Sequence, residues 1–199
     1  MLIPTRHSPD RGDTRGFVLL EVLISILILA FGLLGLAKLQ ASTRQLEMES
    51  YQRAQAVVLL QDMVSRLSAN VKAADCYAIS DLASGSPWLG KDATNIPTSC
   101  SYGTATQQAA AAKDLTDWNN MLLGVSEVDQ SSGANEGAMI DARGCISYDA
   151  ANNVYVVTVV WQGLMATSTP SGLSCGSNQY SPADARRAVS AVVRVPNLS

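Results

Sequence analysis

The sequence is poor in the residues that most enzymes use for catalysis. It has one histidine, His7, and only 16% charged residues among 199 positions. Because His7 lies within the first sixteen residues, no Ser-His or Cys-His dyad can form in the rest of the chain. The H-E-x-x-H and G-x-G-x-x-G patterns and a complete Walker loop are also absent. We therefore expect no catalytic residues, no cofactor and no enzymatic activity.

The sequence also lacks an excess of positive charge. Its formal net charge is −3, whereas a protein that binds nucleic acid by releasing counterions needs a basic face. Arg186 and Arg187, which follow Asp184, could contact an anionic partner such as DNA, but a solvated loop is the simpler interpretation. Trp88 and Trp161 could be binding aromatics, although packing in the core or a loop explains them as well. Nucleic acid is not expected as a partner.

Four cysteines lie in the second part of the chain: Cys76, Cys100, Cys145 and Cys175. An even number of cysteines in a segment that could be exported indicates disulfides. Because there is no C-x-x-C pair and no nearby histidine, a metal site has little support. Four cysteines allow three pairings. We favour Cys76–Cys100 with Cys145–Cys175, because each bond closes a loop-like stretch, but the sequence leaves the other two pairings open.

An almost purely apolar run extends from Phe17 to Ala37 and contains one charge, Glu21. As a helix, this run would be about 31 Å long, close to the roughly 30 Å thickness of a bilayer core. The preceding residues 1–16 carry three arginines and two aspartates, which favours the cytoplasm for this end and the outside for the bulk of the chain. A charge inside a membrane span costs about 2.5–3.5 kcal/mol, so Glu21 needs a partner or a function.

Three interpretations of this segment compete. A secretory signal has a shorter apolar region and a small-residue cleavage site after it, and the best site here, Leu39-Gln40-Ala41, is weak. An uncleaved signal anchor fits the length but leaves Glu21 without a role. The order Gly16-Phe17-x-x-x-Glu21, at the start of the apolar run, resembles the class III signal of type IV prepilins. This resemblance accounts for the leader, the long apolar run and the acidic residue together.

The resemblance implies how the N-terminus is processed. A membrane peptidase would cut between Gly16 and Phe17 and remove the leader, residues 1–16, and Phe17 would then be N-methylated. Gly16 has no side chain, so its backbone can fit closely into a peptidase cleft. Glu21 follows Phe17 by about one helical turn. In the family such a glutamate pairs with the N-terminal amine of a neighbouring subunit, which offsets the desolvation of both charges.

Over about residues 15–42 the chain resembles the minor pilins of the PilV group. The resemblance rests on Leu20-Glu21-Val22-Leu23-Ile24 and on the run from Leu33 to Gln40. Major pilins commonly have a proline further along this helix, where this chain has Lys38. Gly32 and Gly35 could supply flexibility instead, or they could allow close packing between helices.

The resemblance implies a structural minor pilin of a type IV pilus, which helps assembly to start and supports twitching motility or adhesion. Its partners would be the prepilin peptidase and methyltransferase, other minor and major pilins, and the assembly platform of the bacterial inner membrane. The headpiece would be periplasmic and later reach the pilus surface. Two alternatives remain open: a minor pseudopilin of a type II secretion system, and a pilus-linked adhesin or DNA-uptake receptor.

The rest of the sequence predicts an α+β fold. Residues 17–37 form a transmembrane and filament-core helix, and residues 38–71 continue it without proline or glycine. An apolar stripe predicts that this continuation packs on a globular headpiece, residues 72–199. The stripe comprises Val57, Leu60, Val64, Leu67 and Val71.

The headpiece itself is expected to begin with an irregular loop, residues 72–103, held by a disulfide. A surface helix over 104–121 should dock through Leu115, Trp118 and Leu122. Four antiparallel strands are expected at 122–128, at 137–148 with an interruption at Gly144, at 153–162 and at 187–195. A hairpin turn at 150–153 and an exposed loop at 163–182 complete the prediction.

Overall fold

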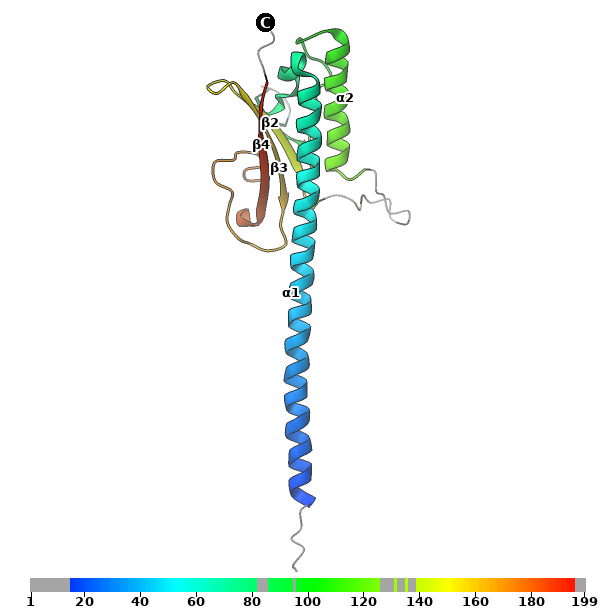
Figure 1. Cartoon of the computed structure of the whole chain (residues 1–199), viewed down its shortest axis with the longest axis vertical. Coiled ribbons are helices and arrows are strands. Elements are labelled where there is room, and N and C mark those ends of the chain that lie inside the picture. Colours follow the sequence, from blue (N-terminus) through cyan, green and yellow to red (C-terminus); the bar gives the residue numbers. More distant parts are fainter. Residues whose placement is uncertain are drawn as a thin grey trace, which may run out of the picture. The chain divides into compact units, whose positions relative to one another are not determined.

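The structure is a computed structural model that describes residues 15–81, 86–94, 96–125, 131, 135 and 139–195, with side chains from residue 18 onward. Its helices are α1 (Arg15–Ala69) and α2 (Ala105–Leu122), with three short 3-10 helices, η1 (Val71–Tyr77), η2 (Ile79–Asp81) and η3 (Ala183–Ala185). Its strands are β1 (Leu89–Gly90), β2 (Arg143–Asp149), β3 (Val154–Gln162) and β4 (Arg186–Arg194) (Figure 1). The predicted fold class, a long N-terminal helix with a four-stranded antiparallel sheet, is confirmed.

The chain divides into two compact units, residues 1–46 and residues 47–199. The second unit, called the headpiece from here on, includes the last part of α1 as well as α2 and the sheet. Its strands follow the order β1-β2-β3-β4, and each pairs antiparallel with its neighbour. The predicted hairpin joins β2 to β3, and Asn153 takes the left-handed conformation, with φ of 52°, that such a turn requires.

The last part of α1 lies on one face of the sheet. Its buried side chains are Ala56, Leu59, Leu60, Met63 and Leu67, and they share one core cluster with Ile146, Val157, Val159 and Trp161. Of the predicted stripe, Leu60 and Leu67 are therefore in the core, and Val64 packs partly buried against it. Val71 falls in η1, because α1 ends at Ala69. The centre of the buried face thus lies slightly to one side of the predicted one.

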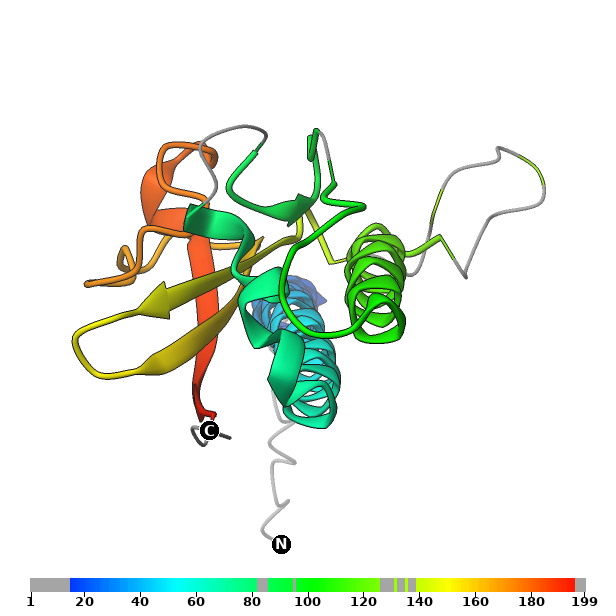
Figure 2. The ribbon, with the colours of Figure 1, turned by 90° about the horizontal axis from the view of Figure 1, so that it is seen from above.

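Helix α2 lies beside the last part of α1 (Figure 2). Thr104 begins it with a capping box, in which Thr104 and Gln107 each accept a hydrogen bond from the other's backbone N–H. All three predicted docking residues, Leu115, Trp118 and Leu122, are at most 1% exposed. The Trp118 indole Nε1 donates to the Leu59 carbonyl oxygen at 2.9 Å, which fixes α2 against α1.

The predicted strand at 122–128 is wrong where the structure describes it. Helix α2 continues to Leu122 because that side chain is buried, and it ends in a turn with Gly124 at φ of 65°; residues 126–130 lie outside the described residues. The fourth strand is instead β1, which lies inside the predicted irregular loop and pairs with β2. The same loop also holds η1 and η2.

The predicted strand at 137–148 begins later than expected, at Arg143, and Gly144 lies inside β2 without interrupting it; residues 137 and 138 lie outside the described part. A Cβ atom on Gly144 would lie 2.4 Å from Cη2 of Trp118. The glycine is therefore needed because the indole of α2 lies directly on the strand. The other two predicted strands are confirmed as β3 and β4 within a residue at each end.

Candidate functional site

The first part of α1 carries the apolar run, and none of the other described residues covers its side chains. Between Val18 and Leu36 the large apolar side chains are 46% to 70% exposed. Among the described residues this is the helix that is long and apolar enough to cross a membrane. Side chains exposed in this way need a nonpolar environment, which a bilayer or other helices of the same kind can supply.

The three residues of the predicted processing and assembly motif all belong to α1. The helix begins at Arg15, so Gly16 and Phe17 lie in its first turn, but the Phe17 side chain lies outside the described part. Glu21 is exposed, and Ser25 donates a hydrogen bond to its backbone carbonyl oxygen at 2.8 Å. The carboxylate of Glu21 has no ion-pair partner among the described residues.

Gly32 and Gly35 lie within the continuous helix α1. A Cβ atom added at either position would meet nothing within 4 Å. Neither glycine is therefore required for packing against the other residues that the structure describes.

The two disulfides join cysteines that are 24 and 30 residues apart in the sequence. Cys76 of η1 is bonded to Cys100, and Cys145 of β2 is bonded to Cys175, with Cα atoms 5.5 Å and 5.9 Å apart. This is the sequence-local pairing. The second bond ties the loop after β3 to the face of the sheet away from α1, where Cys145 and Cys175 pack with Val160 and Tyr180.

The two arginines that could have contacted DNA are held by the protein itself, so the solvated-loop interpretation is wrong. Arg186 is 5% exposed. Its guanidinium donates to the backbone carbonyl oxygens of Pro170, Leu173 and Cys175. Both residues belong to the edge strand β4 and bind the loop that precedes it, which leaves them unsuited to bind a phosphate backbone.

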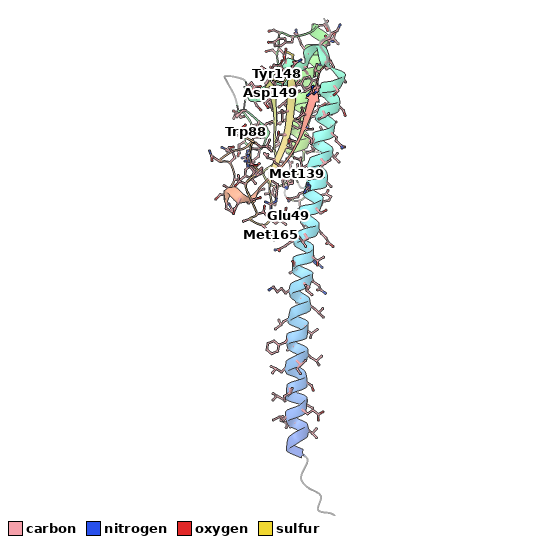
Figure 3. The ribbon with its side chains drawn as sticks, turned by 60° about the vertical axis from the view of Figure 1, so that its left-hand side comes forward. Glu49, Trp88, Met139, Tyr148, Asp149 and Met165 are labelled. Atoms are coloured by element: carbon pink, nitrogen blue, oxygen red, sulfur yellow. A yellow bond between two sulfur atoms is a disulfide. The ribbon has the colours of Figure 1, made fainter. Side chains whose placement is uncertain are left out.

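Arg187 forms an ion pair with Glu49 of α1. Its Nη2 lies 3.2 Å from Glu49 Oε1, and each of the two side chains is 17% exposed. The same carboxylate oxygen accepts hydrogen bonds from the backbone N–H groups of Leu164 and Met165 at 2.7 and 3.3 Å. Glu49 thus joins α1, β4 and the loop after β3 (Figure 3). The sequence does not reveal this contact, because the two charges are separated by 138 positions.

The two tryptophans considered as binding aromatics have different surroundings. Trp161 is 2% exposed and belongs to the main core. Trp88 is half-buried, and the Arg143 guanidinium lies 5.7 Å from its ring centroid and 5.1 Å from that of Tyr180. Arg143, which is 3% exposed, also pairs with Asp92 at 3.0 Å. The packing interpretation therefore accounts for both tryptophans.

A polar network links the C-terminal end of α1 to η1 and α2. Arg66 Nη1 lies 2.8 Å from Asp114 of α2, and Tyr77 donates from its hydroxyl to the same carboxylate at 2.6 Å. Asn70 donates to the Gln107 carbonyl oxygen at 2.8 Å. Burial, together with the hydrogen bond to Asp114, raises the pKa of Tyr77 well above its usual value. The network is a structural clamp between α1, η1 and α2.

A groove of about 400 Å³ lies on the sheet face away from α1, and its lining includes Trp88, Ser147, Thr158 and the Cys145–Cys175 disulfide. Among the residues that the structure describes, no charged side chain lines this groove. It therefore has hydroxyl groups to offer but no ion-pair partner for an anionic or cationic ligand.

The loop after β3 contains a G-x-S-x-G motif, which is the spacing of a hydrolase nucleophile elbow. It runs from Gly172 to Gly176 with Ser174 at its centre. In hydrolases the elbow connects a strand to a helix, whereas this segment is a turn whose Cys175 is bonded to Cys145. The described part of the chain contains no histidine that could activate Ser174, and it contains no group of three side chains placed to hold a metal ion.

Comparisons with protein-family models, with curated proteins and with solved structures found no significant match to this chain.

Proposed function

We propose that this protein is a structural minor pilin of a type IV pilus, similar to the PilV group. The observation that carries the proposal is the combination of two parts in one helix. Its first part exposes an almost purely apolar surface with Glu21 as the one acidic residue, and its last part belongs to the core of a folded headpiece. A helix of this kind fits a subunit that is anchored in a membrane and then transferred into a bundle of similar helices.

The chemistry of this transfer centres on Glu21. In the bilayer its charge is costly, at about 2.5–3.5 kcal/mol. Cleavage between Gly16 and Phe17 would create a new positive amine one turn away, and pairing across subunits would offset the desolvation of both charges. The requirement for a partner would also set the register of neighbouring helices. The described residues offer no nucleotide-binding loop, so the work of extraction would come from a separate ATPase motor.

The proposal includes a location and a set of partners. The protein would be a single-pass protein of the bacterial inner membrane with its headpiece in the periplasm, where the two disulfides are stable. The prepilin peptidase would process it, and major and minor pilins would contact it through the apolar helix. From the pilus it would support assembly, twitching motility or adhesion.

The first test is the N-terminus of the protein purified from native membranes, by intact mass and N-terminal sequencing, with and without the prepilin peptidase of the host. We expect a chain that begins at N-methylated Phe17 only when the peptidase is present. A chain that still carries residues 1–16, or one cut after Ala41, would contradict the proposal.

A second test separates anchoring from assembly. Glu21→Gln keeps the shape of the side chain and removes its charge, so we expect a protein that reaches the membrane but enters sheared filaments poorly. Glu47→Gln, a change of the same kind beyond the apolar run, is the matched control and should assemble normally. Equal incorporation of both variants would contradict the role of Glu21.

Deletion of the gene distinguishes the machines that use such a subunit. Loss of surface pili and twitching supports the pilus, whereas loss of exoprotein secretion with intact pili would assign the protein to a type II secretion system.

A further inference from the structure

A second charged site lies in the headpiece, where α1 passes the start of β4. It is a cavity of about 360 Å³, lined by Glu49, Ser50 and Arg53 of α1, Trp161 of β3, and Arg187 and Ala188 of β4. This volume is at the lower end of the range of about 300–1,000 Å³ for ligand pockets. It suits a single inserted side chain better than a cofactor.

Two of the three charged groups in the cavity already neutralise each other. Glu49 pairs with Arg187 at 3.2 Å. The Arg187 guanidinium also donates to the carbonyl oxygens of Asp184, Ala185 and Met165, so both of its terminal nitrogens are in use. This pair holds the wall of the cavity in place and adds no net charge to it.

Arg53 carries the uncompensated charge. It lies four positions after Glu49, a spacing at which a glutamate and an arginine normally pair on a helix. Here Glu49 is bound to Arg187 instead, and no ion pair or hydrogen bond to Arg53 occurs among the described residues. Because Arg187 of β4 is bound to Glu49, Glu49 does not pair with Arg53, and the positive charge of Arg53 lies on the rim of the cavity.

Trp161 supplies a second unused donor. Its indole Nε1 is buried and has no hydrogen-bond acceptor among the described residues, and the residue as a whole is 2% exposed. An unpaired buried N–H group costs about 1–3 kcal/mol, which an incoming oxygen atom would relieve. Together with the exposed hydroxyl of Ser50, the cavity offers donors and one net positive charge, which is complementary to a carboxylate.

The rim next to this cavity is apolar and exposed. Leu164 and Met165 are 42% and 39% exposed, although the hydrogen bonds of their N–H groups to Glu49 hold the backbone in place. Methionine and arginine are enriched at protein interfaces, and a flanking apolar rim would bury area around one central ion pair. The surroundings therefore favour a protein side chain over a free small anion.

We propose that this cavity binds an aspartate or glutamate side chain of a neighbouring protein subunit, with Arg53 as its ion-pair partner and the Trp161 N–H as a further donor. The choice of a neighbouring subunit rests on the proposed function, because subunits bundled through their helices bring their headpieces together. The site is separate from the apolar helix and from Glu21.

The test is site-specific photo-crosslinking of the full-length protein in its host. A photoreactive phenylalanine analogue replaces Leu164 on the rim, and a control probe replaces Val192, which is 64% exposed on β4. Mass spectrometry then identifies the crosslinked peptide. We expect the rim probe to capture another subunit at a segment that contains an aspartate or glutamate.

Charge variants then test the ion pair. Arg53→Glu should lower the yield of this crosslink by roughly fivefold or more, since repulsion replaces a rim attraction, and arginine in place of the captured acidic residue should restore it. Arg194→Glu, an exposed arginine at the other end of β4, is the matched control and should leave the yield unchanged. Trp161→Phe removes this donor together with part of a buried ring, so it should lower the yield also in protein that stays folded.

Several results would overturn the proposal: no crosslink from the rim, a crosslink to lipid, a captured segment without an acidic residue, or a yield that Arg53→Glu leaves unchanged. The N-terminal analysis separates this proposal from the proposed function. A chain processed at Phe17 that shows no Arg53-dependent crosslink would refute the docking site alone. An unprocessed chain that still shows it would refute the prepilin role alone.

Discussion

Gly144 provides the sharpest test of how the headpiece is packed. Gly144→Ala would place a Cβ atom 2.4 and 2.5 Å from Cη2 and Cζ3 of Trp118 and 2.8 Å from Cδ1 of Leu122. Carbon atoms in good contact lie about 3.5–4.0 Å apart, so the indole or the strand has to move. Neither moves easily, because Trp118 is fully buried and hydrogen-bonded to the Leu59 carbonyl oxygen.

The expected cost follows from these distances. Burying one more methyl group would contribute about 0.8 kcal/mol if there were room for it, but overpacking a filled core costs about 1–3 kcal/mol. We expect a loss near the upper end of that range, because the obstacles are core side chains. For a protein of this size this corresponds to a fall in Tm of about 4–10 °C.

The assay is thermal unfolding of the full-length protein in detergent, followed by near-ultraviolet circular dichroism of the tryptophans. Gly35→Ala is the matched control, since a Cβ there meets nothing within 4 Å, and it should not lower the Tm. Trp118→Phe removes part of the obstructing ring at the cost of a hydrogen bond. Combined with Gly144→Ala, it should destabilise less than the sum of the two single changes, by more than about 0.5 kcal/mol.

An unchanged Tm for Gly144→Ala, or strict additivity in the double variant, would refute this account of the contact between α2 and β2.

Three further predictions concern the contacts that hold the headpiece together. Glu49→Gln removes the charge that holds the loop at residues 163–167, at a cost of about 1–3 kcal/mol, and hydrogen exchange in that loop should accelerate; unchanged protection would contradict the contact. Because the pKa of Tyr77 is raised by burial and a hydrogen bond, the unfolded state ionises first, so stability should be complete below about pH 10 and decline above it. In Tyr77→Phe the urea midpoint should fall less steeply with rising pH than in the wild type. Equal slopes of urea midpoint against pH in the two proteins would refute the assignment. Replacing Cys145 and Cys175 together by serine opens a separation of 30 residues and should cost about 3.5 kcal/mol, and an unchanged urea midpoint would argue against the bond.

The elements that the sequence predicted well are those whose signal is local. The apolar run of α1 and the spacing of Leu60 and Leu67 are patterns of neighbouring residues, and β3 is a single stretch rich in valine. The capping box at Thr104 and the docking residues Leu115 and Trp118 likewise lie within one helix. The processing motif at Gly16, Phe17 and Glu21 is also local, and it stays a prediction until the N-terminus of the protein is measured.

The tertiary structure alone decided the features that depend on distant partners. The two-residue strand β1 is too short to have a pattern, and it is a strand because β2 lies beside it. From the sequence alone Gly144 indicates an interruption of the strand, whereas in the structure it lies within β2 and makes room for Trp118. From the sequence alone Arg187 is expected to be solvated, whereas in the structure it pairs with Glu49, which is 138 positions away in the sequence.

Arg53 shows the physical reason for this division most clearly. Helix geometry by itself predicts that Arg53 pairs with Glu49 one turn earlier, because both side chains lie on the same face. The fold brings Arg187 and two backbone N–H groups to the same carboxylate, and together they outcompete a single exposed pair. The sequence determined which charges are present on α1, and only the packing of β4 against α1 determined which of them is left free to bind a partner.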